Sequence, residues 1–374
     1  MTALTAHGTV GLAVIGCGTV GRIRAVLARE YPGIGWLGLC DTDEPTLKTL
    51  ADDVRADFAT TDLAELLARP EIGAIIVATD EQVHVEPILR SVELGVPMFI
   101  EKPLATDPAD SARVLAAIED AGVDAVVGYT QRFRRRFQTV KQRLRDGQIG
   151  DVTTVITRAF MNRMVPEATL RKVDDPTGLT PMVVSGTHSL DMCMWLMEGR
   201  SPVEVYARST DRTLGPIGTK DGTSGIFTMD DGVVFSMNIN WALPAQWPGA
   251  VYGLEIGIVG TKGVIDIEDT HRDVVLASEI GQPAGYRSRG FDAPAARHVD
   301  FIGSYPPGDL SGGMLWGPMR EETTTWFARI CKGVPTPHAT AADGHRNLLL
   351  TMAMDLSART GAPVELPITP EELA

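Results

Sequence analysis

A glycine-rich turn between an apolar segment and a helical pattern constrains the fold of this chain most strongly. Val10–Ile15 is an almost entirely apolar run, as expected for a strand buried on both faces. The next six residues fit the spacing GxGxxG and lead into a helical pattern over 20–28. Glycines at this spacing allow a tight turn, close approach of the backbone to a pyrophosphate, and close packing of helix on strand. We therefore predict a dinucleotide-binding turn whose cofactor contacts are Gly16, Gly18, Thr19, Val20 and Gly21.

Strand and helix patterns alternate through the first third of the chain. The patterns predict further strands at 36–40, 74–78, 98–100 and 125–127, and helices at 44–53, 85–94 and 107–121. Such alternation is typical of a doubly wound parallel sheet. We therefore expect an α/β Rossmann domain over residues 1–127.

After Gly128 the pattern changes. Strands are expected at 152–159, 203–207, 225–229, 233–240, 254–259 and 264–267, and helices at 132–145, 189–197, 321–331 and 345–360. Residues 270–320 are rich in glycine and proline and match neither pattern. We expect an α+β C-terminal domain over residues 128–374, with a largely antiparallel open sheet and a last helix that could pack back on the first domain.

Asp41 bears on the choice of cofactor. It ends the second expected strand, twenty residues after Gly21. A carboxylate there can accept hydrogen bonds from ribose hydroxyls and would repel a 2′-phosphate, and neither Thr42 nor Asp43 supplies a cation to bind one. The alternative is that Asp41 only caps the following helix. We favour the first interpretation and predict NAD over NADP.

Glu101-Lys102-Pro103 follows the buried strand expected at 98–100. Taken alone, this tripeptide would most often be a surface turn. Ligands of doubly wound sheets, however, bind at the carboxyl ends of the strands, so Lys102 is expected beside a nicotinamide ring. There it could exchange a proton with a substrate hydroxyl. Pro103 is a candidate for a cis peptide bond.

Two histidines accompany these motifs. His188 lies where a helix opens in the second domain, and its imidazole suits general acid–base chemistry near neutral pH. Asp191, within one helical turn, could orient the imidazole or simply pack. By itself, such a histidine is more often a structural or capping residue. His84 is expected at the start of a helix near the cofactor.

Composition excludes several functions. A net charge of −14 argues against general nucleic-acid binding. The four cysteines have no CxxC or zinc spacing, so we expect a reduced, cytoplasmic protein without structural metal. Residues 1–9 have no basic segment and the apolar stretch 10–15 is too short for a signal peptide or a membrane span, so we expect neither there. Residues 131–172 carry eleven Lys/Arg against three acids, which indicates a solvated helix face or a basic wall that attracts an anionic substrate.

Together the motifs resemble the glucose–fructose oxidoreductase / inositol dehydrogenase (Gfo/Idh/MocA) family. The residues that carry the resemblance are 16–21, Asp41, 78–79 with His84, 101–105, 128–129 with 132–133, 146–150, 186–191 and 260–263. The resemblance implies a Rossmann domain and an open-sheet domain through which dimers or tetramers form. It also implies Lys102 and His188 as catalytic residues facing the C4 edge of the nicotinamide, with Thr79, His84, Glu101 and Lys102 at the cofactor.

Two departures from the family pattern bear on the substrate. Val184 stands where the family has the acid of Asp-x-x-x-His, and Arg134 to Arg136 stand where an Asp or Asn and a Pro are common. Losing an acid removes repulsion toward an anion, and arginine can grip a carboxylate through two hydrogen bonds. We expect a small hydroxylated substrate, with or without a carboxylate, and candidate contacts Arg132, Asn162, Arg163 and Thr187.

The leading interpretation is an NAD-dependent dehydrogenase. It would oxidise a secondary alcohol of a sugar, cyclitol, sugar acid or dihydrodiol to a ketone, or run the reverse. Two alternatives stay open: a lyase or glycosidase that retains NAD and oxidises its substrate transiently, and a non-catalytic NAD-bound regulator. Net formation of NADH separates the first from the other two.

Overall fold

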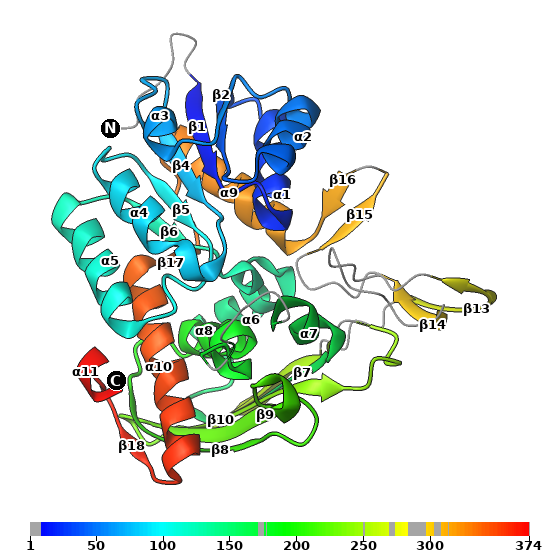
Figure 1. Ribbon diagram of the computed structural model, residues 1–374. Helices are drawn as coiled ribbons and strands as arrows, with labels where there is room; N and C mark the ends of the chain where they lie inside the picture. Colours follow the sequence, from blue (N-terminus) through cyan, green and yellow to red (C-terminus); the bar gives the residue numbers. More distant parts are fainter. Residues whose placement is uncertain are drawn as a thin grey trace. The chain divides into compact units, whose positions relative to one another are not determined.

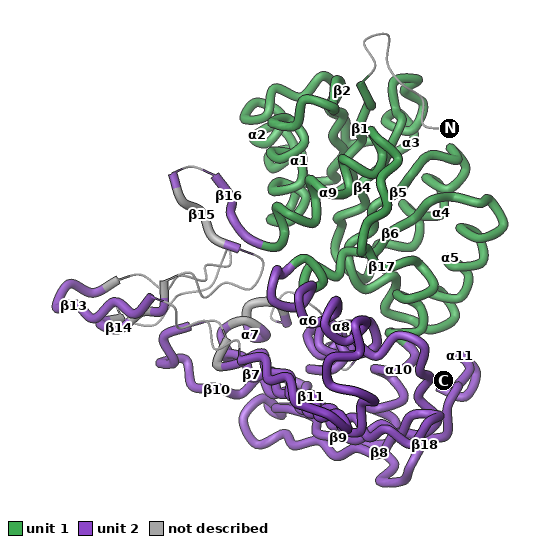
Figure 2. Tube along the Cα trace, turned by 180° about the vertical axis from the view of Figure 1, so that it is seen from behind, with its two compact units in different colours: residues 1–133, 318–348 green, residues 134–317, 349–374 purple. Residues whose placement is uncertain are grey.

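The computed structural model consists of two compact units, coloured separately in Figure 2. Unit 1 comprises residues 1–133 and 318–348, and unit 2 comprises residues 134–317 and 349–374. The structure describes residues 9–170, 176, 178–249, 251–268, 274–282, 297–302, 308–312 and 314–373. Arg171 and Lys172 of the basic run lie outside the described residues.

Unit 1 is built on a seven-stranded sheet of order β17-β6-β5-β4-β1-β2-β3 (Figure 1). Six strands run parallel and the seventh, β17, is antiparallel. The strands are β1 Val10–Ile15, β2 Ile34–Cys40, β3 Phe58–Thr60, β4 Ala74–Val77, β5 Met98–Ile100, β6 Ala125–Val127 and β17 Ala339–Thr340. Every residue of β1 and β4 is buried, which explains why these strands are continuous apolar runs. The expected doubly wound parallel sheet is confirmed.

Helices cover both faces of this sheet (Figure 1). They are α1 Thr19–Glu30, α2 Glu44–Val54, α3 Leu63–Leu67, α4 Val85–Val92, α5 Pro108–Ala121 and α9 Pro318–Lys332. Ile88 of α4 and Val114 of α5 join the cluster formed by Ile75 and Val77 of β4. On the opposite face α1 packs against β1, β2 and α9.

Unit 2 contains a second seven-stranded sheet, of order β12-β11-β7-β10-β9-β8-β18. Its strands are β7 Val152–Asn162, β8 Pro202–Thr210, β9 Gly222–Met229, β10 Val234–Leu243, β11 Val251–Gly260, β12 Gly263–Ile267 and β18 Val364–Glu365. Only the pair β7/β10 is parallel, so the expectation of a largely antiparallel sheet is confirmed. The turn between β9 and β10 carries Gly232 at φ 83°, a left-handed conformation that favours glycine.

One face of this sheet is covered by helices and the other is open. Alternate residues of β10 (Phe235, Met237 and Ile239) are buried. They pack with residues of α6 Arg135–Arg145, α8 Thr187–Leu196 and the second half of α10 Ala341–Thr360. The opposite face exposes Ile156 and Ile226 among polar neighbours. This in–out alternation is what a half-buried antiparallel sheet requires.

Several elements differ from the sequence-based expectations. The helix expected at 132–145 begins at Arg135, because Thr130–Phe133 form a separate 3-10 turn. The residues before α8 form a π-helical turn, Met182–Gly186. The unassigned region 270–320 forms the hairpins β13 Val274–Gln282 with β14 Arg297–Ile302, and β15 Asp309–Ser311 with β16 Met314–Trp316.

The remaining short elements are η1 Glu81–Val83, η4 Gly215–Ile217, α7 Met164–Leu170 and α11 Pro370–Leu373. Among the described residues, none of the helices has both the length and the apolar character needed to cross a bilayer. All four cysteines are free thiols.

Asp355 predicts a pH dependence of stability in unit 2. This carboxylate of α10 is half-buried and accepts a hydrogen bond from Thr180 Oγ1 at 2.5 Å. Burial raises the pKa of Asp355 to about 7, against the opposing influence of Thr180, Arg359 and Lys220. The folded chain therefore keeps a proton that the unfolded chain releases near its ordinary pKa of 3.8. Stability should fall as pH rises between these two values, by at most about 4 kcal/mol.

Asp355→Asn removes this titration while keeping an acceptor for Thr180. We expect the variant's Tm to fall less than the wild-type Tm between pH 5 and about 8, as followed by thermal unfolding. Asp230→Asn, an exposed carboxylate of the β9–β10 turn, is the control. Parallel Tm curves for wild type and Asp355→Asn would contradict the assignment.

Candidate active site

Five strands of unit 1 end in one row. The last residues of β2, β1, β4, β5 and β6 are register partners along the sheet: Cys40, Ile15, Val77, Ile100 and Val127. Because these strands are parallel, the residues that follow them emerge at the same carboxyl edge. The candidate residues predicted from separate motifs are thus brought together: the glycine turn, Asp41, Thr79, and Glu101 with Lys102.

The three glycines of the turn have different roles. Gly16 has φ 94°, and a Cβ there would lie 2.5 Å from the carbonyl of Ala78. A Cβ on Gly21 would lie 1.8 Å from the carbonyl oxygen of Gly16. By contrast, a Cβ on Gly18 would meet no described atom within 4 Å. The fold itself therefore requires Gly16 and Gly21, whereas the space at Gly18 leaves room for a pyrophosphate.

The N-terminus of α1 faces this space. Gly18 is the N-cap of α1 and Thr19 its first residue, both exposed. Because no side chain of the described residues caps this end, its backbone N–H groups can bind an anion. Thr79 Oγ1 is buried at the same edge without a hydrogen-bond partner among the described residues. Donors, space and an uncommitted hydroxyl together fit a bound dinucleotide.

Asp41 joins the end of β2 to the glycine turn. Its Oδ2 accepts a hydrogen bond from Cys17 N at 2.6 Å, and its Oδ1 accepts one from Asp43 N at 2.8 Å. The N-cap of α2 is Asp43, so Asp41 does not cap that helix. The carboxylate instead lies beside the predicted pyrophosphate turn, half-buried.

Glu101 belongs to a buried ionic network. Its Oε1 accepts two hydrogen bonds from Arg24 of α1, from Nε at 2.9 Å and from Nη2 at 2.6 Å. Arg24 Nη2 also bonds Glu322 Oε2 of α9 at 2.7 Å, and Thr130 Oγ1 donates to the same oxygen at 3.0 Å. Burial raises the pKa of Glu322, and the nearby Glu101 raises it further. The network anchors the residue before Lys102 to two helices, α1 and α9.

Lys102 follows this anchor and is half-buried. The Lys102–Pro103 peptide bond is cis, as expected from the sequence. His84 is fully buried next to this peptide bond. Its Nδ1 contacts the carbonyl oxygen of Pro103 and its Nε2 contacts that of Thr79. His84 is the N-cap residue of α4, but its side chain does not cap that helix.

His188, in unit 2, is half-buried in the first turn of α8, after the π-helical turn. Thr187 and Asp191 beside it are both buried. Val184 packs in an apolar cluster with Leu179, Leu214 and Trp241. The structure therefore has an apolar side chain, packed against other apolar side chains, at the position of the family's acid.

Ser185 is the polar residue next to Val184. Its Oγ accepts a hydrogen bond from Trp241 Nε1 at 2.9 Å. A hydroxyl is both donor and acceptor, so Ser185 can also donate one hydrogen bond. The π-helical turn before His188 thus has a hydroxyl next to the position at which the family pattern has a carboxylate, which only accepts.

Three of the predicted substrate contacts are held by other residues. Asn162 is buried; its amide donates to the carbonyls of Ala245 and Trp247, and its oxygen accepts from Met164 N. Arg132 is also buried and pairs with Asp343 at 3.5 Å. Arg163 lies 4.0 Å from Glu167. These contacts stabilise the local fold, and we do not carry the three residues into the proposed site.

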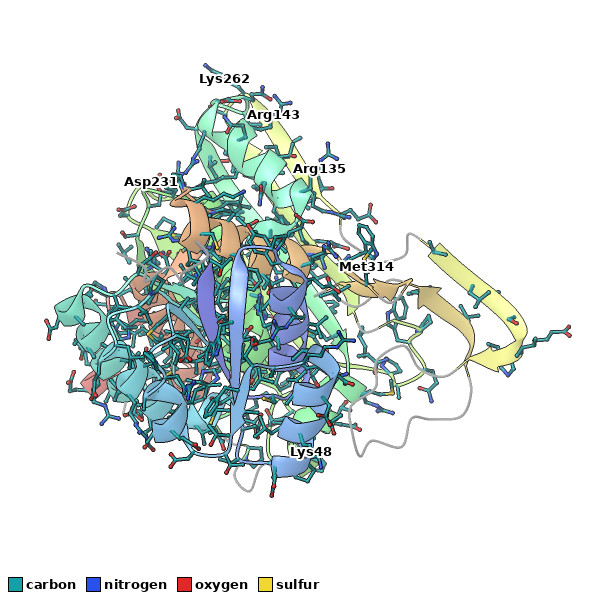
Figure 3. The ribbon with its side chains drawn as sticks, turned by 90° about the horizontal axis from the view of Figure 1, so that it is seen from above. Lys48, Arg135, Arg143, Asp231, Lys262 and Met314 are labelled. Atoms are coloured by element: carbon teal, nitrogen blue, oxygen red, sulfur yellow. The ribbon has the colours of Figure 1, made fainter. Side chains whose placement is uncertain are left out.

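The basic run fits a solvated helix face. Arg135 and Arg143 are exposed on α6 and lie at its surface in Figure 3. Lys141 is buried, but it donates to the carbonyl of Trp195 and pairs with Glu198 at 2.5 Å. Arg145 shares the same Glu198 at 2.8 Å. These positive charges are hydrated or compensated by acids, which does not support a basic wall on this helix.

Sequence reasoning missed Arg24, Glu322 and Ser185. A signal for Arg24 existed, since it falls on the buried stripe of α1 with Gly21, Ala25 and Ala28. An arginine in such a stripe needs a buried acid as partner. Glu322 had no comparable signal, because nothing local distinguishes it from Glu321.

Comparisons with known proteins agree with this arrangement. Residues 10–129 match the model of the oxidoreductase family with an NAD-binding Rossmann fold, and residues 137–266 match the GFO/IDH/MocA C-terminal domain. An inositol 2-dehydrogenase of Gluconacetobacter diazotrophicus is 28% identical over 319 residues, covering 82% of this chain and 89% of that protein. A 2,7-anhydro-N-acetylneuraminate hydratase of Mediterraneibacter gnavus is 28% identical over 265 residues. This match covers 70% of this chain and 67% of that protein.

The fold recurs in solved structures. The scyllo-inositol dehydrogenase of Lactobacillus casei, solved with NAD(H) and scyllo-inositol, superposes with a TM-score of 0.74 at 16% identity. The match covers 96% of this chain and 99% of that one. Fold and site define an oxidoreductase with an NAD-binding Rossmann domain. The chain belongs to the Gfo/Idh/MocA family.

Proposed function

We propose that this protein is an NAD-dependent dehydrogenase that oxidises a secondary alcohol of a small polyol to a ketone, or runs the reverse. The observation that carries the proposal is the row of strand ends that places the glycine turn, Asp41 and Lys102 at one edge. Residues 1–127 would bind the dinucleotide. Residues 128–374, apart from 128–133 and 318–348 of unit 1, would supply the substrate site and the contacts between subunits.

Lys102 and His188 have distinct roles in this proposal. The Lys102 amine accepts the proton of the substrate hydroxyl as the carbonyl forms. His188 is its partner or the alternative base, since an imidazole exchanges protons near neutral pH. Glu101, held by Arg24, fixes the backbone from which Lys102 projects. Bound NAD supplies the acceptor for the hydride that leaves the carbinol carbon.

The substrate class follows from the relatives and from Ser185. One relative is named an inositol 2-dehydrogenase, which favours a cyclitol or sugar. A carboxylate at Val184 would repel an anion, whereas the hydroxyl of Ser185 can donate to one. We therefore include sugar acids and ring-carboxylated dihydrodiols with neutral cyclitols and sugars. If neutral compounds were turned over far faster than every acidic analogue, the acidic part of this class would be wrong.

The experiment is a panel of cyclitols, sugars, sugar acids and dihydrodiols with NAD, followed by nicotinamide absorbance. We expect net NADH with at least one of them. Conversion of a substrate without net NADH would favour the lyase or glycosidase alternative. Tight NAD binding without any conversion would favour the regulator.

Asp41 is expected to set the preference for NAD. Asp41→Ser removes the charge that would repel a 2′-phosphate and keeps a hydroxyl near Cys17 N. The ratio of kcat/KM for NAD to that for NADP should fall by about tenfold or more, a difference of roughly 1.4 kcal/mol. Asp53→Ser, on the exposed ion pair with Arg22, is the control. An unchanged ratio would argue against Asp41 as the discriminating residue.

We further propose that the open face of the second sheet binds a second copy of the chain. Tyr206, Ile226, Ser236 and Ile156 are register partners across four strands, and three of these side chains are large and exposed. Contiguous apolar patches of this kind mark protein interfaces. Ile226→Glu should convert a dimer or tetramer to a smaller species in light scattering. A wild-type monomer at micromolar concentration would contradict this.

We also propose a cytoplasmic location. The four cysteines are free thiols, three of them buried, which fits a reducing compartment.

A further inference from the structure

His84 bridges two strand ends of unit 1. Its Nε2 lies 2.7 Å from the carbonyl oxygen of Thr79, which follows β4. Its Nδ1 lies 3.0 Å from the carbonyl oxygen of Pro103, which follows Lys102. The side chain is fully buried, so no bulk water competes for either nitrogen. The imidazole therefore connects the end of β4 to the segment that carries Lys102.

Both partners of His84 only accept hydrogen bonds. A neutral imidazole has one N–H and one lone pair, so it can donate to only one carbonyl. The other ring nitrogen would then place its lone pair against a carbonyl oxygen at 2.7 or 3.0 Å. Only the doubly protonated ring, with two N–H groups, satisfies both contacts.

His338 provides a contrast within the same unit. It is also buried, and its Nε2 lies 3.1 Å from the carbonyl oxygen of Glu322. Its Nδ1, however, lies 2.8 Å from the hydroxyl of Thr336, which can donate. A neutral ring satisfies both of these contacts. Burial lowers the pKa of His338 to about 3, in agreement with a neutral ring.

We propose that His84 is a positioning residue which carries two ring protons and a positive charge, and which fixes the Lys102–Pro103 segment to the end of β4. The proposal rests on the proposed function in one respect, the catalytic role of Lys102. The two charge-assisted hydrogen bonds offset the cost of burying the cation.

The charge of His84 can be measured directly. In the ¹⁵N-histidine-labelled full chain at neutral pH, long-range ¹H–¹⁵N spectra should show two protonated ring nitrogens for His84 and one for His338. The signals are assigned through each residue's own backbone, so no variant is needed. A single protonated nitrogen on His84 would overturn the charged bridge.

The positioning role is tested by kinetics with the panel of hydroxylated compounds. His84→Gln is neutral and its single amide nitrogen cannot replace both ring nitrogens. Its kcat should fall by about 10²-fold, the cost of small misplacements in an active site, and this loss should exceed any loss of NAD affinity. The control is His345→Gln, whose half-buried ring contacts Ser111 at 3.0 Å. Its kcat should stay near wild type.

The possible failures are distinguishable. If wild type forms NADH and His84→Gln retains its kcat, the positioning role is wrong and the proposed function stands. If wild type and His345→Gln form no NADH with any compound, the proposed function fails, while the nuclear magnetic resonance result still decides the charge of His84. If His84→Gln does not fold, Lys102 mobility is compared in wild type and His84→Asn by lysine relaxation measurements. Equal mobility would overturn the proposal.

Discussion

Lys102→Ala is expected to lower kcat by about 10²–10⁴-fold, the usual contribution of a general acid–base group. The amine lies at the carboxyl edge of the sheet, directly after Glu101, which Arg24 anchors. Removing the side chain leaves the glycine turn and Asp41 intact, so the affinity for NAD should fall far less than kcat does. Steady-state kinetics and NAD titration measure the two quantities separately. Near-normal turnover would refute the role of Lys102.

Lys102→Arg separates proton transfer from charge. A guanidinium stays protonated and cannot accept the hydroxyl proton. If Lys102 acts as a base, the arginine variant should be as impaired as the alanine variant. If the lysine only supplied positive charge, arginine would restore much of the rate. Lys48→Ala, an exposed lysine of α2 (labelled in Figure 3), is the control for both and should retain full activity.

Arg24→Met is expected to destabilise unit 1 by about 3–5 kcal/mol, the range for breaking a buried ion pair. Methionine fills much of the space of the arginine stem and keeps its packing near Phe99, over which the guanidinium lies at 4.1 Å. The charges are the main loss, since Glu101 and Glu322 would face each other without a cation. Denaturant unfolding should show the loss in free energy.

Two comparisons make the Arg24 prediction specific. Arg22→Met breaks an exposed pair with Asp53 and should cost about 1 kcal/mol or less. Arg24→Met combined with Glu322→Gln removes one of the two stranded carboxylates and should be more stable than Arg24→Met alone. A cost for Arg24→Met no larger than that for Arg22→Met would show that the network contributes little.

Much of the fold of unit 1 was predictable because its strands are buried on both faces. Continuous apolar runs as short as Val10–Ile15 are typical of buried strands, and GxGxxG marks the turn that follows. The three-residue strand β3 and the short helix α3 escaped prediction, because a half-buried three-residue segment has no measurable period. The hairpins of residues 274–316 escaped for a different reason. Their exposed apolar residues do not alternate toward a core, as Val274 and Val275 illustrate.

The candidate site was predictable where its residues follow strand ends. Asp41 and Lys102 each sit directly at such an end, and parallel register brings those ends together. The supporting contacts were not predictable, because they join distant segments. Arg24 bonds Glu322, which lies 298 positions further along the chain. The bridge made by His84 depends on which backbone carbonyls face the ring, and sequence does not record that.

The central claim is that Lys102 accepts a proton while a carbinol hydride moves to NAD. The most direct test is a substrate deuterated at the carbinol carbon, used in single-turnover reactions with wild type and Lys102→Ala. Nicotinamide absorbance gives the rate, and mass spectrometry of the NADH gives its deuterium content. We predict deuterated NADH from wild type, and the same product from Lys102→Ala at a rate about 10²–10⁴-fold lower. Deuterated NADH formed by Lys102→Ala at the wild-type rate, or conversion of substrate by wild type without any deuterium in NADH, would contradict the account.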